Sequence, residues 1–357
     1  MIHLPKARTP QFAALAATGV FALALSGCGT TDDPSADATS TSQAVSEECA
    51  ADTTTTSTGP VSLTDSQGRT LELDEPAKRV VVLEWQQTKD LLTLCVTPVG
   101  AASIKDYATY VQAETLPDDV ADVGERGEPD LDAIYATNPD LIIVEANSPD
   151  DELLAKLDEG DVPVLATRGT DTSGQIDNMK EVFSLIAEAT GRTERADQVL
   201  AEFDEHLASA KEEVTDSQLE TTDFVFFDGW IESGNVVIRP YGEGAMFTEL
   251  GEQLGLTGAW DDDADATSGS GGVDPEYGLA QTDIEGLTAV GDANLIYAND
   301  GTEDSYVNEL VKSPIWNALP AVKEGRAFEF PAGIWGAGGP RSNEAAIDAF
   351  VQVITGK

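Results

Sequence analysis

The alternation of short apolar runs with short helical patterns constrains the fold of this chain more than any other feature. Short apolar runs bounded by turn residues are typical of strands buried in a parallel sheet. Helical patterns between such runs supply the crossover connections that parallel strands need. The predicted strands cover residues 79–83, 99–101, 141–144 and 162–166, and the predicted helices cover residues 88–94, 130–136 and 150–157. This order predicts an α/β lobe with a parallel sheet.

A long helical region separates this lobe from a second stretch of the same kind. Residues 176–190 form an amphipathic pattern that ends at Gly191, and a second pattern runs from Thr193 to about Val214. About 20 helical residues span roughly 30 Å, so we expect the second helix to brace two lobes. The alternation then resumes with predicted strands at 224–227, 236–238, 295–297 and 327–330 and a closing helix at 345–354.

The predicted fold is therefore α/β, with two Rossmann-like lobes that have parallel sheets and are joined by one long helix. We expect no internal repeat to be visible at residue level. The predicted N-terminal lobe covers residues 61–175, the helical linker residues 176–216 and the C-terminal lobe residues 217–357.

The first 60 residues carry an export signal and a spacer. A basic start, an apolar run and small residues before Cys28 have the order of a signal peptide over residues 1–27. The final four residues, Leu-Ser-Gly-Cys, resemble the bacterial lipobox, in which the cysteine is lipidated. We expect a lipid on Cys28 to anchor the protein to the extracytoplasmic face of the cell membrane; the alternative is an ordinary secretory signal. Residues 28–60 are rich in Ser, Thr, Ala and Asp and predict a flexible tether.

The net charge limits the classes of binding partner, and the cysteine content indicates a disulfide. Without residues 1–27 the chain has 18 Lys and Arg against 65 Asp and Glu, a formal charge of −47. Such a charge argues against nucleic acid and against an anionic membrane surface as partners, so we expect membrane contact through the lipid alone. Apart from Cys28, only Cys49 and Cys95 remain, and an even pair in an exported protein indicates one disulfide. The alternative is a buried thiol at Cys95 and a free Cys49 in the tether.

Catalytic and metal-binding patterns are missing from the sequence. After residue 27 the only histidine is His206, which lies beside Asp204 and Glu205 in the long helical pattern and is expected to face solvent. Zinc sites need several His or Cys ligands, and no phosphate-binding loop or nucleophile elbow is present. Carboxylates are abundant, but no pair stands out as glycosidase-like. We therefore expect no enzyme activity, no metal site and no cofactor.

Aromatic and arginine side chains follow the predicted strands of both lobes. Ligands of parallel α/β units bind beyond the carboxyl ends of the strands. Trp and Tyr offer apolar faces with a polar handle, and Arg offers a planar fork to carboxylate, phosphate or metal-bound oxygen. Each residue also has a structural alternative, either core packing or an ion pair with one of the many acids. The predicted ligand-binding residues are Trp85, Arg126, Trp230, Arg239, Tyr241, Trp335 and Arg341, with Glu84, Asn147 and Ser148 at the same strand ends.

Four blocks of the sequence carry a family resemblance: residues 79–100, 122–143, 277–297 and 333–342. The first three resemble the class III substrate-binding proteins of ABC importers, which are siderophore and cobalamin receptors, and the fourth is similar to the closing segment of actinobacterial iron-siderophore receptors. The resemblance covers about residues 61 to 355. It implies two lobes with a shallow cleft and small closure. It also implies a monomer that captures a ferric siderophore, with the hydroxamate type favoured, and delivers it to an ABC transporter permease.

The resemblance assigns further roles. One exposed acid in each lobe would dock on the permease: Asp132, with Glu128 as its rival, and Glu285. Cys95 stands where the family often has Gly, which favours its pairing with Cys49. The alternatives are a haem or cobalamin receptor of the same fold, with Tyr241 as the possible haem ligand, a cell-surface α/β hydrolase, or an adhesive lipoprotein.

Overall fold

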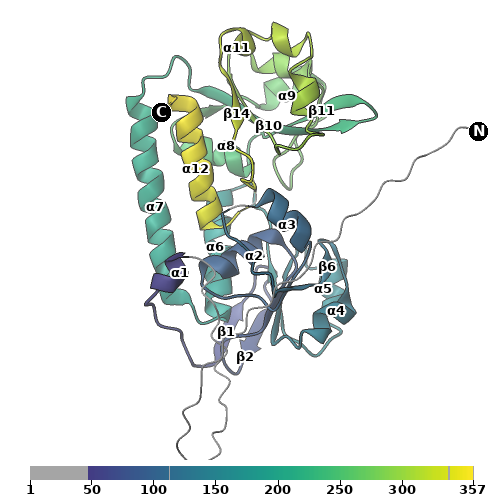
Figure 1. The fold of residues 1–357 in the computed structure, drawn as a ribbon, viewed down its shortest axis with the longest axis vertical. Helices are drawn as coiled ribbons and strands as arrows, with labels where there is room; N and C mark the ends of the chain where they lie inside the picture. The colour runs from purple at the N-terminus through teal and green to yellow at the C-terminus, as the bar shows by residue number, and fades with distance from the viewer. Residues whose placement is uncertain (1–46, 112, 337, 357) are drawn as a thin grey trace, which may run out of the picture. The chain divides into compact units, whose positions relative to one another are not determined.

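The computed structural model describes residues 47–111, 113–336 and 338–356, all within one compact unit (Figure 1). The predicted signal peptide, the lipidation site Cys28 and the tether up to residue 46 lie outside the described residues. Two sheets, each covered by helices, form an N-terminal and a C-terminal lobe in this unit. Among the described helices, none combines the length and apolarity that crossing a membrane would require.

The sheet of the N-terminal lobe is parallel and buried on both faces. Its strand order is β5-β4-β3-β8-β9. Along β8, Leu141 and Ile143 enter one core cluster whereas Ile142 and Val144 enter another, which explains why the run is apolar at every position. The strand bounds are β3 Val80–Val82, β4 Gly100–Ala101, β5 Ala121–Asp122, β8 Leu141–Glu145 and β9 Val164–Thr167.

Helices cover the two faces of this sheet; α2, α4 and α5 lie close to where the sequence predicts them, whereas α3 was not predicted. The carboxylate of Asp130 accepts a hydrogen bond from the Ala133 amide (3.1 Å) and so caps α4, as expected for the residue before a helix. The helices are α2 Trp85–Thr93, α3 Ile104–Tyr110, α4 Leu131–Ala136 and α5 Glu152–Leu157. Two antiparallel ribbons add to the predicted elements: β1 Val61–Thr64 with β2 Thr70–Leu73, and β6 Gly124–Glu125 with β7 Glu128–Pro129.

The sheet of the C-terminal lobe has a parallel core and one antiparallel strand. Strand β10 is parallel to β12 and β13, and β13 is parallel to β14. The predicted strand at 236–238 is antiparallel to β10, because residues 228–239 form a hairpin arm whose second strand returns along the first. The strands are β10 Asp223–Glu232, β11 Asn235–Pro240, β12 Thr257–Gly258, β13 Asn294–Ala298 and β14 Ala327–Phe330. The short helices of this lobe are α8 Met246–Gln253, α9 Asp262–Ser268, η1 Gly286–Val290, α10 Val307–Leu310, η2 Trp316–Ala318 and α11 Pro320–Lys323.

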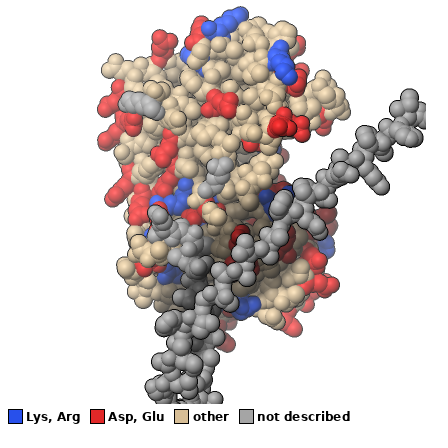
Figure 2. All heavy atoms as spheres, in the orientation of Figure 1, with Lys and Arg blue, Asp and Glu red and all other residues tan. Residues whose placement is uncertain are grey.

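Helices that span both cores join the lobes. Helix α7, Thr193–Asp216, is the predicted brace: Val199 packs into the core of the N-terminal lobe and Phe203 into that of the C-terminal lobe. Helix α6, Gln175–Ala189, also contributes to both cores, and α12, Pro340–Thr355, lies beside α7 (Figure 1). Acidic side chains gather along the edge of the molecule where α7 runs (Figure 2). Bending between the lobes would therefore disturb packed helices.

The segment before β1 differs from the predicted tether. Residues 47–51 form helix α1, and a disulfide joins Cys49 to Cys95. The buried side chain of Arg192 donates hydrogen bonds to Asp52, Thr54 and Thr56. The folded part therefore includes residues 47–60, which the sequence analysis assigned to the tether. The correction has a physical cause: polar residues are ordered here by partners that lie far away in the sequence.

Candidate ligand-binding site

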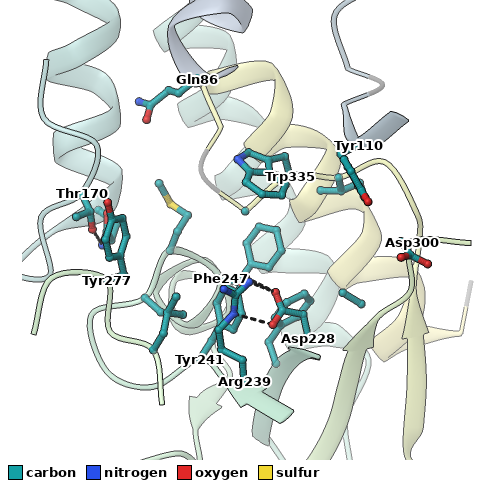
Figure 3. A pocket seen from close by; sticks show the side chains of 18 of the residues that line it. Gln86, Tyr110, Thr170, Asp228, Arg239, Tyr241, Phe247, Tyr277, Asp300 and Trp335 are labelled. Carbon is teal, nitrogen blue, oxygen red and sulfur yellow. Dashed lines mark hydrogen bonds and ion pairs between the residues drawn. The ribbon is translucent and has the colours of Figure 1, made fainter. Parts of the chain in front are cut away.

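A cavity of about 660 Å³ is lined by residues of both lobes. Its wall in the N-terminal lobe comes from the ends of β3 and β8, the β6–β7 hairpin and the start of α6. The wall in the C-terminal lobe comes from the β10–β11 arm, α8, and the loops after β13 and β14. Figure 3 shows Tyr277 and Thr170 across the cavity from Asp300, with Trp335 and Tyr241 between them. This volume falls in the usual range for small-molecule sites.

Arg126 is held flat against tryptophan rings on the first wall. Its guanidinium carbon lies 4.2 Å from the ring centroid of Trp85 and 5.4 Å from that of Trp335. Its Nε donates to Glu84 (2.8 Å), and its backbone amide donates to the Ser103 hydroxyl (3.0 Å). Within the described residues its two terminal nitrogens have no hydrogen-bond partner. The ring stack and Glu84 thus orient a fork whose remaining donors are free for ligand oxygens.

Trp85 is buried behind the cavity wall, whereas the sequence analysis predicted that it contacts ligand. The residue is 4% exposed and does not line the cavity, because Arg126 and Trp335 cover its ring. The rings of Trp85 and Trp335 meet edge to face with centroids 4.9 Å apart. Trp85 therefore supports the wall, whereas Trp335 forms part of it.

The second wall carries an arginine that is already paired. Opposite each other in the β10–β11 register, Asp228 and Arg239 form a two-pronged ion pair, with Nε to Oδ1 at 2.8 Å (dashed in Figure 3). Burial alone would lower the pKa of Arg239, but hydrogen bonding and charge pairing with Asp228 outweigh it and raise the pKa. Trp230 lies beside this pair, with its ring centroid 5.8 Å from the Arg239 guanidinium. The fork of Arg239 is thus committed to Asp228.

Tyr241 lines the cavity as a neutral phenol. Its hydroxyl donates to Asp228 (3.2 Å), and its ring meets Phe226 and Phe247. Burial raises the pKa of Tyr241, and the nearby charge of Asp228 raises it further. The side chain offers an apolar face to the cavity, and its hydroxyl hydrogen is already donated to Asp228.

Arg341 lies outside the cavity, contrary to the prediction that it contacts ligand. At the first turn of α12 its guanidinium pairs with Glu344 (2.8 Å), Glu48 (2.9 Å) and Glu202. These acids belong to α12, α1 and α7. Arg341 therefore ties the N-terminal segment to the spanning helices.

The sequence analysis missed Glu145, the last residue of β8, as a cavity residue. Burial, first, and then the negative charge of Glu84 raise the pKa of Glu145 to about 7, whereas Arg126 opposes the shift. The hydroxyl of Tyr277 donates to its Oε1 across a long 3.4 Å. Its place at a strand end was the available signal, but the abundance of acids in the chain hid it.

Asn147, expected at the same strand end, bridges the two lobes. Its Nδ2 donates to Glu276 (2.8 Å) and to the Tyr277 hydroxyl (3.0 Å). Next to this contact, the Thr170 hydroxyl donates to the Glu276 carbonyl (2.9 Å). These bonds fasten the loop around residue 277 to the N-terminal lobe at one rim of the cavity.

The three acids predicted to dock on a permease are exposed. Asp132 lies in the first turn of α4, Glu128 in β7 and Glu285 just before η1. His206 lies on α7, where its Nε2 is 2.9 Å from Asp348 of α12, away from the cavity. In the part of the chain that the structure describes, no three His, Cys, Asp or Glu side chains gather as metal ligands would.

The sequence is similar to a family of binding proteins and to several of its characterised relatives. The family model described as "Periplasmic binding protein" matches residues 80–333. The iron(3+)-hydroxamate-binding protein FhuD of Escherichia coli is 25% identical over 281 residues, which are 78% of this chain and 88% of FhuD. The Fe(3+)-citrate-binding protein YfmC of Bacillus subtilis is 25% identical over 275 residues, 76% of this chain and 78% of YfmC.

Solved structures agree with this fold. The siderophore-binding protein FhuD of Vibrio cholerae, bound to Fe3+–Desferal, superposes with a TM-score of 0.62 at 26% identity, covering 78% of this chain and 98% of that one. The petrobactin-binding protein YclQ of Bacillus subtilis superposes with a TM-score of 0.65 at 18% identity, covering 83% and 98%. These relatives are binding proteins and not enzymes, in agreement with the prediction of a non-enzymatic chain.

Proposed function

This chain belongs to the periplasmic binding protein family, and from that premise we propose that it captures a ferric hydroxamate siderophore for an ABC importer. The observation that carries the proposal is the cavity between the lobes, walled by tryptophan and tyrosine rings and by one arginine with free donors. The ferric siderophore is the transported ligand and not a cofactor.

The charge of the cavity favours hydroxamates over other iron chelators. Four carboxylates line it, Glu84, Glu145, Asp228 and Asp300, against two arginines that are both paired with an acid. A ferric trishydroxamate has no net charge at its iron centre, whereas a ferric triscatecholate is strongly negative. An anionic complex would meet uncompensated carboxylates, which oppose its binding in a partly buried site.

Intrinsic tryptophan fluorescence tests this function, because Trp230 and Trp335 line the cavity. The protein lacking residues 1–28 is titrated with a ferric trishydroxamate, ferric citrate, a ferric triscatecholate, haem and cobalamin, each also without its metal where that form exists. We expect saturable quenching by the ferric trishydroxamate and little by the ferric triscatecholate. Tight binding of the catecholate complex instead would overturn the hydroxamate assignment. If none of the compounds quenches the fluorescence, the proposed siderophore function is wrong.

We also propose that the protein is anchored through a lipid on Cys28 and delivers its ligand through Asp132, or its rival Glu128, and Glu285. Exposed carboxylates in both lobes suit basic sites on a permease, and a like-charge contact there opposes docking. Reversal of the charge at Glu285 or Asp132 to lysine should lower cellular uptake of the iron complex several-fold with ligand affinity unchanged. Glu128→Lys decides between the two first-lobe candidates, and the exposed Glu220→Lys serves as the control. Normal uptake by all three variants would disprove the docking assignment.

A further inference from the structure

Glu145 is the partly buried carboxylate of the cavity wall that lacks a paired cation. Arg126 pairs with Glu84 and Arg239 with Asp228, so neither arginine is committed to Glu145. Within the described residues, no Lys, Arg or His forms an ion pair with it. The remaining lining carboxylate, Asp300, is exposed and accepts hydrogen bonds from its own turn. A half-buried charge without a countercharge is unfavourable, so the carboxyl tends to keep its proton unless the working complex supplies a cation.

The surroundings of Glu145 hold its carboxylate in place and leave it open to the cavity. A Cβ added at Gly169 would lie 2.2 Å from the carboxyl carbon, so the chain approaches the carboxylate closely on that side. On another side Tyr277, itself held by Asn147, donates to Oε1 at 3.4 Å. Among the described residues nothing donates to Oε2. The oriented carboxylate thus has unused acceptor capacity toward the ligand space.

We propose that Glu145 is the counter-ion for a positively charged amine arm of the transported complex, so that the receptor selects ferric hydroxamates that carry a free ammonium group. This inference rests on the proposed function and narrows its ligand class. An ammonium has three donors, which suit both carboxylate oxygens and the Tyr277 hydroxyl oxygen at this end of the cavity. The neutral iron centre would occupy the aromatic and arginine side, where Arg126 has free donors.

The same geometry links binding to pH. Titratable groups that face Glu145 are Glu84, Arg126, Tyr277 and Glu276, and their balance with burial leaves the pKa of Glu145 at about 7 in the free protein. An ammonium binds the ionised carboxylate better and lowers its pKa. Affinity for an amine-bearing complex should therefore rise as the pH increases toward about 7 and level off above it, whereas a complex without the amine should lack this dependence.

A matched ligand pair tests the inference. Ferric desferrioxamine B carries a free primary amine, and its N-acetyl derivative differs only in lacking that charge. Titrated by tryptophan fluorescence, the protein lacking residues 1–28 should bind the amine complex about tenfold tighter than the acetylated one. Glu145→Gln, which keeps the side-chain shape, should abolish this preference by weakening the amine complex. Asp300→Asn, which removes the rival carboxylate of the cavity, should keep the preference, and Glu220→Gln, at an exposed acid outside the cavity, serves as the control.

The outcomes separate this inference from the function on which it rests. Equal affinities of the wild-type protein for both complexes would overturn the role of Glu145 and leave the hydroxamate function standing. A preference that survives Glu145→Gln but disappears in Asp300→Asn would also overturn it. Failure of both complexes to bind would overturn the proposed function and this inference together.

Discussion

Replacing Arg126 by alanine is expected to weaken binding of a ferric trishydroxamate by about 10- to 150-fold, because hydrogen bonds to a charged donor contribute about 1.5–3 kcal/mol. The terminal nitrogens of Arg126 have no hydrogen-bond partner in the described structure. Ligand oxygens can therefore accept hydrogen bonds from them, and no bond within the protein has to break first. Contact with Trp85 and Trp335 also fixes the guanidinium before the ligand arrives. Little ordering entropy is then lost on binding.

Two further variants make this prediction specific. Arg126→Lys should recover only a small part of the affinity, because an ammonium cannot reproduce the planar fork or its stacking on the indole rings. Arg168→Ala, which removes a partly exposed arginine paired with Asp171 outside the cavity, should bind like the wild type. Circular dichroism and thermal unfolding check that each variant is folded. Wild-type affinity in Arg126→Ala would show that the ligand binds elsewhere.

The predictable part of the site is the part that local pattern determines. A run such as 80–83 is apolar at successive positions because both faces of its sheet are covered, and this pattern favours a buried parallel strand. Side chains after such strands must then lie at one edge of the sheet. Arg126 and Trp335 were placed at the cavity by this argument, and α7 followed from an uninterrupted helical period.

The unpredictable part depends on packing between distant segments. Whether Trp85 faces a ligand or lies behind Arg126 is decided by Trp335, which is 250 positions later in the chain. Arg341 is drawn away from the cavity by acids of three separate helices. Arg239 reaches the cavity for a reason other than the predicted one. Its strand is antiparallel, and the hairpin arm returns Arg239 to the edge of the sheet opposite Asp228.

Loss of the disulfide is the second large effect that we expect. The bond closes a loop over a sequence separation of 46 residues and ties α1 to the end of α2. A loop of that size restricts the unfolded chain enough that Cys49→Ser should lower the free energy of unfolding by about 2–4 kcal/mol. Denaturation in guanidinium chloride measures the change, and a reductant should destabilise the wild type to a similar degree without affecting the variant. Ligand affinity should stay unchanged, since neither cysteine lines the cavity.

A second substitution separates the cross-link from the backbone conformation of Cys95. Cys95 follows the last turn of α2 with φ of 62°, and the amides of Cys95 and Val96 donate to Leu92 and Leu91, a helix ending that usually has glycine at this position. A cysteine is strained there, and the disulfide explains why one is present. Adding Cys95→Gly to Cys49→Ser should therefore restore about 1 kcal/mol of the lost stability. If the double variant is instead no more stable than Cys49→Ser, the left-handed conformation of Cys95 carries no strain. If reduction leaves the wild type unchanged, the cross-link itself does not stabilise the fold.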